Sequence, residues 1–331
     1  MRPESSNKIL NAAKTNAFLV TNLINIRYLT GFQVSSGIVL VTKSSIALYV
    51  DSRYLEAAEK SVYKNISVKP RENIKTALNR IKNCGVEADT MTIREYGKWK
   101  RKNKNTKFVQ TEEVIQEFRK TKTPEELRKF KRAQSITRKI IESIPSMLKQ
   151  GTTELEIAER IRRMAVDLGA EGLSFDPIVA FEANSSRPHH HPSNKKWKKG
   201  MMLQIDIGAK YKGYCADQSA VFFSKKKTKK QESTYKAVLE AKNKATKLVC
   251  SGASTHNLYQ IACEVLNKYG MKDNFTHALG HGVGLEIHEG SSLTDKIPET
   301  SLESGEIVTI EPGVYFPGEF GIRLEDEVIV K

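Results

Sequence analysis

Residues 202–223 read MLQIDIGAKYKGYCADQSAVFF, and this stretch decides how the second half of the chain is interpreted. Apolar residues alternate with other residues at its start, which predicts a strand over residues 202–209. A second run of apolar and aromatic residues predicts a returning strand over residues 214–223. The Lys212-Gly213 pair lies between the two runs, where a tight turn would join them. We therefore expect a strand pair here.

Each of these two strands carries one aspartate. Asp206 alternates with three apolar residues, so its carboxylate is expected on the face of the strand opposite to Leu203, Ile205 and Ile207. Asp217 lies on the returning strand, so one hairpin can present both carboxylates to the same cation.

The same order of elements recurs nearer the C-terminus. A second strand pair is expected over residues 307–311 and 322–330, and it carries Glu311 and Glu325. Two expected helices precede each strand pair, which predicts a diverged internal duplication with the acidic residues at a central site. These helices are expected to run from residue 123 to about 148, from 153 to 169, from about 232 to 249 and from about 255 to 269.

A histidine with glycine on both sides completes this set of polar residues. His281 lies in Gly280-His281-Gly282-Val283-Gly284, where the glycines leave the imidazole unobstructed. Together with the two aspartates and two glutamates it offers four carboxylates and one imidazole. Four negative charges would balance two divalent cations, whereas burying so many carboxylates without metal is costly unless they take up protons.

These motifs resemble those of the pita-bread metallopeptidases, the group that contains methionine aminopeptidase, prolidase and Xaa-Pro aminopeptidase. The order Asp, Asp, His, Glu, Glu matches the metal ligands of that family. The resemblance implies that Asp206 binds one metal ion, that His281 and Glu311 bind the other, and that Asp217 and Glu325 bridge both. The oxygen-rich ligand set suits Mn²⁺, and Co²⁺, Fe²⁺ or Zn²⁺ could also occupy it.

Further histidines resemble those of the proline-directed branch of this family. His288, in Glu286-Ile287-His288-Glu289, and His189 would face the scissile bond and stabilise the negative charge that develops there. His190 and His191 follow His189, so a surface run, or a register shifted by one residue, stays open as an alternative. The distance along the chain from Asp206 favours His189.

The same resemblance places His277 beside the proline pocket and Arg323 behind the metal ligands. Arg323 stands two positions before Glu325, so the two side chains are expected to share a strand face and to pair. A core histidine with a satisfied hydrogen bond stays open as the alternative interpretation of His277.

The first part of the chain alternates apolar strands with helical patterns, which predicts an α/β domain. Residues 25–32, NIRYLTGF, are similar to the N-terminal domain of creatinase, prolidase and Xaa-Pro aminopeptidase, which implies a creatinase-like, ribonuclease-H-like fold. Thr123, Pro124 and Glu126 have the pattern of a helix start. We therefore expect an N-terminal domain over residues 1–120 and an α+β pita-bread catalytic domain over residues 121–331. In the first domain, strands are expected over residues 18–21, 37–41 and 46–50, and helices over 52–60, 72–82 and 92–102.

The resemblance implies an Xaa-Pro aminopeptidase, in which water activated by two divalent cations attacks the carbonyl carbon before proline. Glu311 is then expected to carry the proton from the water to the proline nitrogen. Ser292 stands where many prolidases have an arginine for the free carboxylate of a dipeptide, which favours longer peptides. A prolidase and a non-catalytic binding protein with the same fold are the alternatives.

Composition argues against several other kinds of binding site and against a membrane span. The formal charge of +16 comes mostly from dispersed lysines, without an aromatic stacking pattern, so a solvated basic surface is favoured over nucleic-acid binding. The four cysteines form no C-x-x-C pair, which argues against a thiolate zinc site. Residues 1–10 are polar and no apolar run is long enough to cross a membrane, so we expect a cytoplasmic protein. The family resemblance implies a homodimer.

Overall fold

The computed structural model describes residues 6–331, and the chain divides into two compact units, Met1–Arg119 and Lys120–Lys331. Residues 1–5 of the polar start at 1–10 lie outside the described part, and the rest enter helix α1 (Ser6–Ala13). Among the helices from residue 6 onward, none combines the length and the apolar character that a membrane crossing requires.

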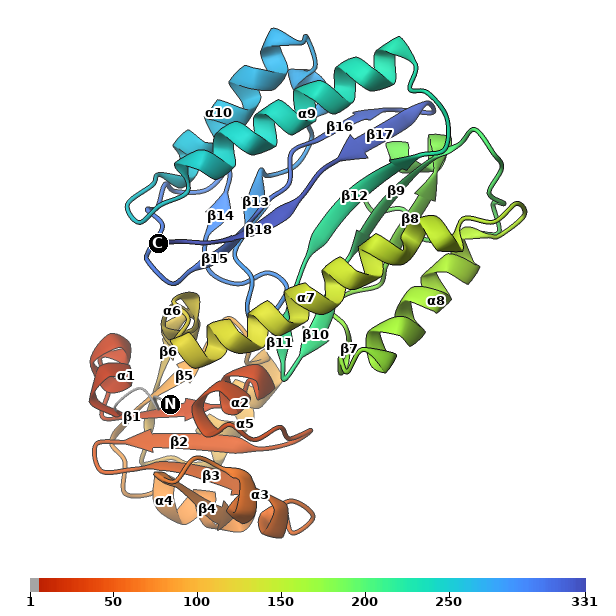
Figure 1. Cartoon of the computed structure of the whole chain (residues 1–331). Helices are drawn as coiled ribbons and strands as arrows, with labels where there is room; N and C mark the ends of the chain where they lie inside the picture. Colours follow the sequence, from red (N-terminus) through yellow and green to blue (C-terminus); the bar gives the residue numbers. More distant parts are fainter. Residues whose placement is uncertain (1–5) are drawn as a thin grey trace. The chain divides into compact units, whose positions relative to one another are not determined.

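Unit 1 is a six-stranded mixed sheet with helices on both faces (Figure 1). The strand order is β4-β3-β2-β1-β5-β6, and only β2 runs antiparallel to its neighbours. The strands are β1 (Ala17–Val20), β2 (Ile38–Thr42), β3 (Ile46–Val50), β4 (Ile66–Pro70), β5 (Asn83–Glu87) and β6 (Lys107–Thr111). The further helices are α2 (Leu23–Thr30), α3 (Leu55–Ser61), α4 (Ile74–Leu78), α5 (Ile93–Lys102) and α6 (Val114–Lys120).

Side-chain alternation along the strands builds two apolar cores in unit 1. Phe18 packs with the helices α1, α2, α3 and α6, whereas its neighbours Ala17 and Leu19 pack with α4 and α5 on the other face. The sheet is therefore buried on both sides, which explains its nearly continuous apolar strands. The expected α/β fold of this part is confirmed.

Sequence patterns missed or misplaced several elements of unit 1. The helix expected over 72–82 is wrong in extent, because a 3₁₀ turn (Arg71–Asn73) precedes the short α4 and strand β5 follows soon after. Strands β4 to β6 and helices α1, α2 and α6 were not expected. The helix over 92–102 is confirmed, with Thr92 and Glu95 forming its capping box.

Unit 2 consists of two similar halves, each with a helix pair packed on antiparallel strands (Figure 1). The helices are α7 (Pro124–Met147) and α8 (Glu154–Asp167) in the first half, and α9 (Lys229–Leu248) and α10 (Thr255–Lys268) in the second. The first-half strands are β7 (Gly172–Leu173), β8 (Ile178–Phe181), β9 (Met202–Ile207), β10 (Ala209–Tyr211), β11 (Tyr214–Cys215) and β12 (Gln218–Phe223). The second-half strands are β13 (Gly280–His281), β14 (Ser292–Leu293), β15 (Ile307–Ile310), β16 (Gly313–Phe316), β17 (Phe320–Arg323) and β18 (Asp326–Ile329).

The expected duplication of unit 2 is confirmed by its two apolar cores. One core joins α7 and α8 to β8 and β9, and the other joins α9 and α10 to β15, β16 and β17. The capping boxes at Thr123 and Thr153 start α7 and α8 as expected. Helix α9 starts earlier than expected, because Thr228 and Gln231 form another capping box.

The expected strand pairs are each broken into two. The returning strand over 214–223 stops between β11 and β12 at Ala216 and Asp217, and the last strand over 322–330 stops at Leu324 and Glu325. The first expected strand is interrupted at Gly208, where glycine is required because a Cβ would meet the Ala216 carbonyl oxygen at 1.7 Å. Strand β9 pairs with β12, while β10 pairs with β11.

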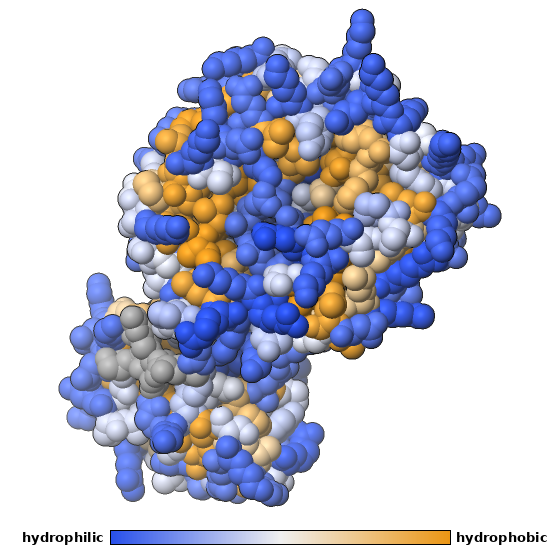
Figure 2. Space-filling view, viewed as in Figure 1, coloured by the Kyte–Doolittle hydropathy of each residue, from blue (hydrophilic) through white to orange (hydrophobic). Residues whose placement is uncertain are grey.

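Figure 2 shows hydrophilic residues in a central strip on the visible face of unit 2, with hydrophobic residues on both sides of it. The hydrophobic areas agree with two separate apolar cores. A polar strip between two apolar halves is where acidic ligands from both halves can converge.

Candidate metal centre and active site

A pocket of about 350 Å³ opens in unit 2, and the predicted site residues gather at it. It is lined by Phe175, Ile178, Pro188, His189, Asp206, Asp217, His277, Ala278, His281, Ile287, His288, Ser292, Glu311 and Arg323. Of the side chains that the sequence predicted for the site, only Glu325 is outside this lining, and it is almost completely buried beside Asp217 and His281.

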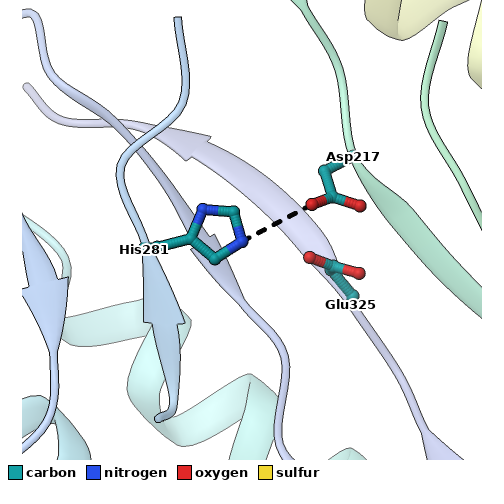
Figure 3. A group of neighbouring side chains, drawn as sticks. All are labelled: Asp217, His281 and Glu325. Atoms are coloured by element: carbon teal, nitrogen blue, oxygen red, sulfur yellow. Dashed lines mark ion pairs between the residues drawn. The ribbon is translucent and has the colours of Figure 1, made fainter. Parts of the chain in front are cut away.

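Asp217, His281 and Glu325 point toward one shared space (Figure 3). One potential ligand atom from each lies within 4.8 Å of the others. The His281 Nε2 atom is 3.5 Å from Asp217 Oδ2 and 3.4 Å from Glu311 Oε1. An imidazole nitrogen and three carboxylates therefore face each other across a gap that a cation could fill.

Two of these carboxylates lie at the interruptions between consecutive strands. Asp217 and Glu325 occupy corresponding interruptions in the two halves of unit 2. The Glu325 amide donates to the Ser219 carbonyl oxygen at 3.2 Å, and the Asp217 amide donates to Glu327 Oε1 at 2.8 Å. The backbone at each break is thus held by the other half, which fixes both side chains toward the centre.

Arg323 binds Asp206, the predicted metal ligand that has not yet been placed. Its Nη2 donates to Asp206 Oδ2 at 2.5 Å, and its Nε donates to Ser219 Oγ at 2.9 Å. The expected pairing of Arg323 with Glu325 is wrong, since among residues 6–331 the carboxylates in ion pairs with Arg323 belong to Asp206 and Glu311. The strand ends at Arg323, so simple alternation does not extend to residue 325.

His277 is held by its neighbours and is not free to bind a substrate oxygen. Its Nδ1 lies 2.7 Å from the Ala278 carbonyl oxygen, which can only accept, so Nδ1 carries the proton. Its Nε2 then accepts from the Tyr315 hydroxyl at 3.0 Å, and Arg323 Nη1 donates to that hydroxyl at 2.6 Å. Burial and the nearby Arg323 charge lower the pKa of His277 to about 4, which keeps the ring neutral.

The three consecutive histidines have separate surroundings. His189 lines the pocket, His190 is buried with its Nε2 2.9 Å from Glu154 Oε2, and His191 is exposed. His288 also lines the pocket, and its ring stacks edge-on against His281 with centroids 4.2 Å apart. His189 and His288 are thus the imidazoles with access to a bound peptide.

Burial and mutual repulsion raise the pKa values of the clustered carboxyls. Burial first, and then neighbouring carboxylates, raise the pKa of Asp217 and of Glu325 well above their ordinary values. Burial raises the pKa of Glu311 to about 8, although Arg323 opposes this shift. Burial lowers the pKa of His281 to about 4. These buried carboxyls would therefore be stabilised in their ionised form by a bound cation.

The donor set fits divalent cations. Three buried carboxylate oxygens, Asp206 Oδ1, Asp217 Oδ1 and Glu325 Oε1, have no hydrogen-bond partner among residues 6–331. Buried charged oxygens without partners are costly, and each can serve as a ligand atom for a hard cation. The neutral imidazole of His281 adds a nitrogen that suits Mn²⁺, Fe²⁺, Co²⁺ or Zn²⁺ better than Ca²⁺.

We predict that the metal-free protein loses stability as pH rises from 6.5 to 8. Below pH 8 folded Glu311 keeps a proton that the unfolded chain, with a pKa near 4.5, has already released, so raising pH favours unfolding. His281 acts in the opposite direction only below pH 6.5, where the unfolded imidazole begins to take up a proton. Thermal unfolding with excess chelator should therefore show a falling Tm across this window.

Added divalent metal should reverse that trend, because ligands bind metal in their deprotonated form. The rise in Tm on adding Mn²⁺ is expected to increase from pH 6.5 to 8. A metal-free Tm that stays level or rises over the same range would contradict the buried, protonated carboxyls.

Several side chains of the site gave no recognisable signal in the sequence. Ser219, Tyr315 and Glu327 support the predicted ligands through hydrogen bonds, as described above for Arg323, His277 and Asp217. Phe175 and Ile178 supply an apolar wall. These residues come from distant parts of the chain, and only the folded structure brings them together.

Comparisons with known proteins divide this chain at nearly the same place as its structure. Residues 2–121 match the model of the Creatinase/Prolidase N-terminal domain, and residues 128–331 match that of Metallopeptidase family M24.

Relatives of both substrate classes match over almost the full chain. The Xaa-Pro dipeptidase of Pyrococcus furiosus is 31% identical over 331 residues, covering 99% of this chain and 94% of the relative. The crystal structure of an X-Pro aminopeptidase from Thermotoga maritima superposes with a TM-score of 0.91 at 30% identity, covering 99% of this chain and 95% of the other. An Xaa-Pro dipeptidase structure from Bacillus anthracis gives 0.93 at 31% identity, covering 99% and 94%.

Proposed function

Because the chain belongs to Metallopeptidase family M24 and carries the Creatinase/Prolidase N-terminal domain, we propose that it is an Xaa-Pro aminopeptidase that uses two metal ions. Its substrates are peptides with proline in the second position, and it releases their first residue. The observation that carries this proposal is the convergence of three carboxylates and four imidazoles on one pocket of unit 2, with the carboxylate of Glu325 buried beside Asp217 and His281.

In this proposal Asp206, Asp217, His281, Glu311 and Glu325 hold two divalent cations, with Mn²⁺ as the first choice. Such a metal pair supplies Lewis-acid polarisation of the peptide carbonyl and lowers the pKa of water. The unpartnered oxygens of the aspartates and of Glu325 support this assignment.

In this proposal Glu311 moves the proton that the reaction requires. Its carboxyl faces the pocket, and a carboxylate in that position can accept a proton and then return it. It takes the proton from water and delivers it to the proline nitrogen, which must be protonated to leave. Thr309 Oγ1 donates to Glu311 Oε1 at 3.3 Å and holds the carboxyl in place.

His189 and His288 stabilise the oxygen that gains negative charge. Both line the pocket, and no hydrogen bond within residues 6–331 engages the ring of either. Burial lowers the pKa of His288, so the ring is neutral and can still donate one N–H. Two such donors aimed at the developing oxyanion lower the barrier of peptide hydrolysis.

The residues that line the pocket favour peptides longer than two residues over dipeptides. A dipeptide places its free carboxylate next to proline and needs a cationic partner there. Arg323 is the one lysine or arginine in the lining, and it is 4% exposed and already engaged by Asp206, Ser219 and Tyr315. Ser292 offers only a hydroxyl.

The activity test compares three substrates on one preparation. Protein is stripped with chelator, reloaded with Mn²⁺, and given an Xaa-Pro-Xaa tripeptide, an Xaa-Pro dipeptide and a Met-Ala-Xaa peptide. Metal-dependent release of the first residue from the tripeptide, with the highest kcat/KM of the three, is expected. Faster dipeptide cleavage would assign a prolidase, the second candidate, which the named activity of the Pyrococcus relative favours. No cleavage with any divalent metal would contradict enzymatic function.

We predict that Ser292→Arg shifts specificity toward dipeptides. Ser292 lies in β14, opposite His281 of β13, and it lines the pocket, so an arginine there would add a cation that can pair with the free carboxylate of a dipeptide. The ratio of kcat/KM for dipeptide over tripeptide should rise by roughly tenfold or more, as expected for one charge-assisted hydrogen bond. Ser292→Gln is the matched control, since it adds length without charge and should leave the ratio within about twofold. Equal ratios in both variants would contradict this account of specificity.

The resemblance to the family also leads us to propose a homodimer that works in the cytoplasm. Sedimentation of the purified protein and fractionation of the source cells test these two points.

A further inference from the structure

Glu154 is a buried carboxylate that lies outside the pocket and holds both ends of one pocket segment. It is the first residue of α8 and its side chain is fully buried. Its Oε1 accepts from the Phe181 amide at 2.7 Å and from Asn184 Nδ2 at 2.8 Å. Its Oε2 accepts from the Ser193 amide at 2.9 Å, from the Ser193 hydroxyl at 2.6 Å and from His190 Nε2 at 2.9 Å.

The charge on Glu154 is stable in this position. Burial by itself raises the pKa of Glu154, but hydrogen bonds from Ser193, His190 and the Phe181 amide lower it, and the net pKa is below its ordinary value. The amino end of a helix also favours a negative charge. A single ionised carboxylate therefore closes the segment 181–193 into a loop.

The middle of that loop reaches the pocket. Pro188 and His189 line the pocket, whereas His190, the next residue, turns back toward Glu154. The far side of the loop is tied to the second half of unit 2, where the Gly321 amide donates to Ser185 Oγ at 2.9 Å. The loop is thus fixed at Glu154 and at strand β17, with His189 between these anchors.

We propose that Glu154 and His190 are positioning residues for His189, an inference that rests on the role of His189 in the proposed function. His190 is not among the residues that line the pocket, and it acts through the backbone that it shares with His189. Since catalytic donors must be held to within a fraction of an ångström, loosening this anchor lowers kcat more than it weakens substrate binding.

The key variant is His190→Leu, which fills a similar volume and removes the bond to Glu154. His190→Gln is the conservative partner, because its Nε2 can donate to the same oxygen. His191→Leu is the matched control at the exposed neighbour. We expect kcat for an Xaa-Pro tripeptide to fall roughly 10- to 100-fold in His190→Leu, to recover to within about threefold in His190→Gln, and to stay within about twofold in His191→Leu.

A double-mutant cycle with His189→Ala separates positioning from general damage. If His190 acts through His189, His190→Leu should lower kcat by less than about threefold once His189 is already alanine. The same 10- to 100-fold loss in both backgrounds would overturn the proposal, and so would an unchanged kcat in His190→Leu.

Hydrogen exchange tests the anchor without any activity measurement. Amides of residues 181–193 in the metal-free protein should exchange at least about tenfold faster in His190→Leu than in His191→Leu, while helix α7 keeps its protection. Equal exchange would overturn the proposal even if the enzyme is active. A wild-type protein that cleaves no Xaa-Pro peptide, with the faster exchange still present, would instead contradict the proposed function and leave the anchor established.

Discussion

Glu311→Gln is expected to lower kcat for an Xaa-Pro tripeptide by roughly 10⁴-fold, the upper range for loss of a general acid-base group. The amide keeps the shape of the side chain but can neither carry the proton nor supply a negative charge to a metal ion. The Glu311 carboxyl lies 3.4 Å from His281 Nε2 and 4.0 Å from Arg323 Nε. Steady-state kinetics at saturating Mn²⁺ measure the effect.

The fold should tolerate this change. Above pH 8 the metal-free wild type must ionise a buried carboxyl, whereas the glutamine stays neutral, so the metal-free variant should be at least as stable there. Glu319→Gln is the matched control, because Glu319 is exposed and pairs only at the surface with Lys230. More than a tenth of wild-type kcat in Glu311→Gln, or an equal loss in Glu319→Gln, would refute the assigned role.

Arg323→Met is expected to destabilise the metal-free protein by about 3–5 kcal/mol, because it leaves the buried Asp206 carboxylate without its cation. The lost guanidinium also donates to the Ser219 and Tyr315 hydroxyls, which hold Glu325 and His277. For a unit of this size the Tm should fall by on the order of 10 °C. Thermal unfolding at pH 8 in chelator measures the shift.

Arg323→Lys provides the comparison, since lysine keeps the charge but not the planar set of five donors. It should recover part of the stability, while activity stays low because Tyr315 and His277 lose their link to the ligand cluster. An unchanged Tm in Arg323→Met would contradict the claim that Arg323 stabilises the fold by pairing with the buried Asp206 carboxylate.

Local sequence patterns were sufficient to predict those elements that are set by interactions between residues a few positions apart. The capping boxes at Thr123 and Thr153 located two helices, because their hydrogen bonds join residues three positions apart. Alternation at 202–207 assigned Leu203 and Ile205 to the core and Asp206 to the opposite face. Patterns failed for the long strands, which are interrupted at Gly208, where the Ala216 carbonyl oxygen approaches so closely that no Cβ would fit.

Residue identity and order determined the helix pairs, the strand pairs and the ligand candidates of the second part, because side-chain periodicity and turn chemistry are local properties of the chain. The pita-bread fold was implied by the resemblance of these motifs to the family. The tertiary structure alone decided that Arg323 pairs with Asp206 rather than Glu325. It also decided that His189 faces the pocket while His190 binds Glu154. These choices depend on groups far apart in sequence, whose distances and burial are set only when both halves of unit 2 pack together.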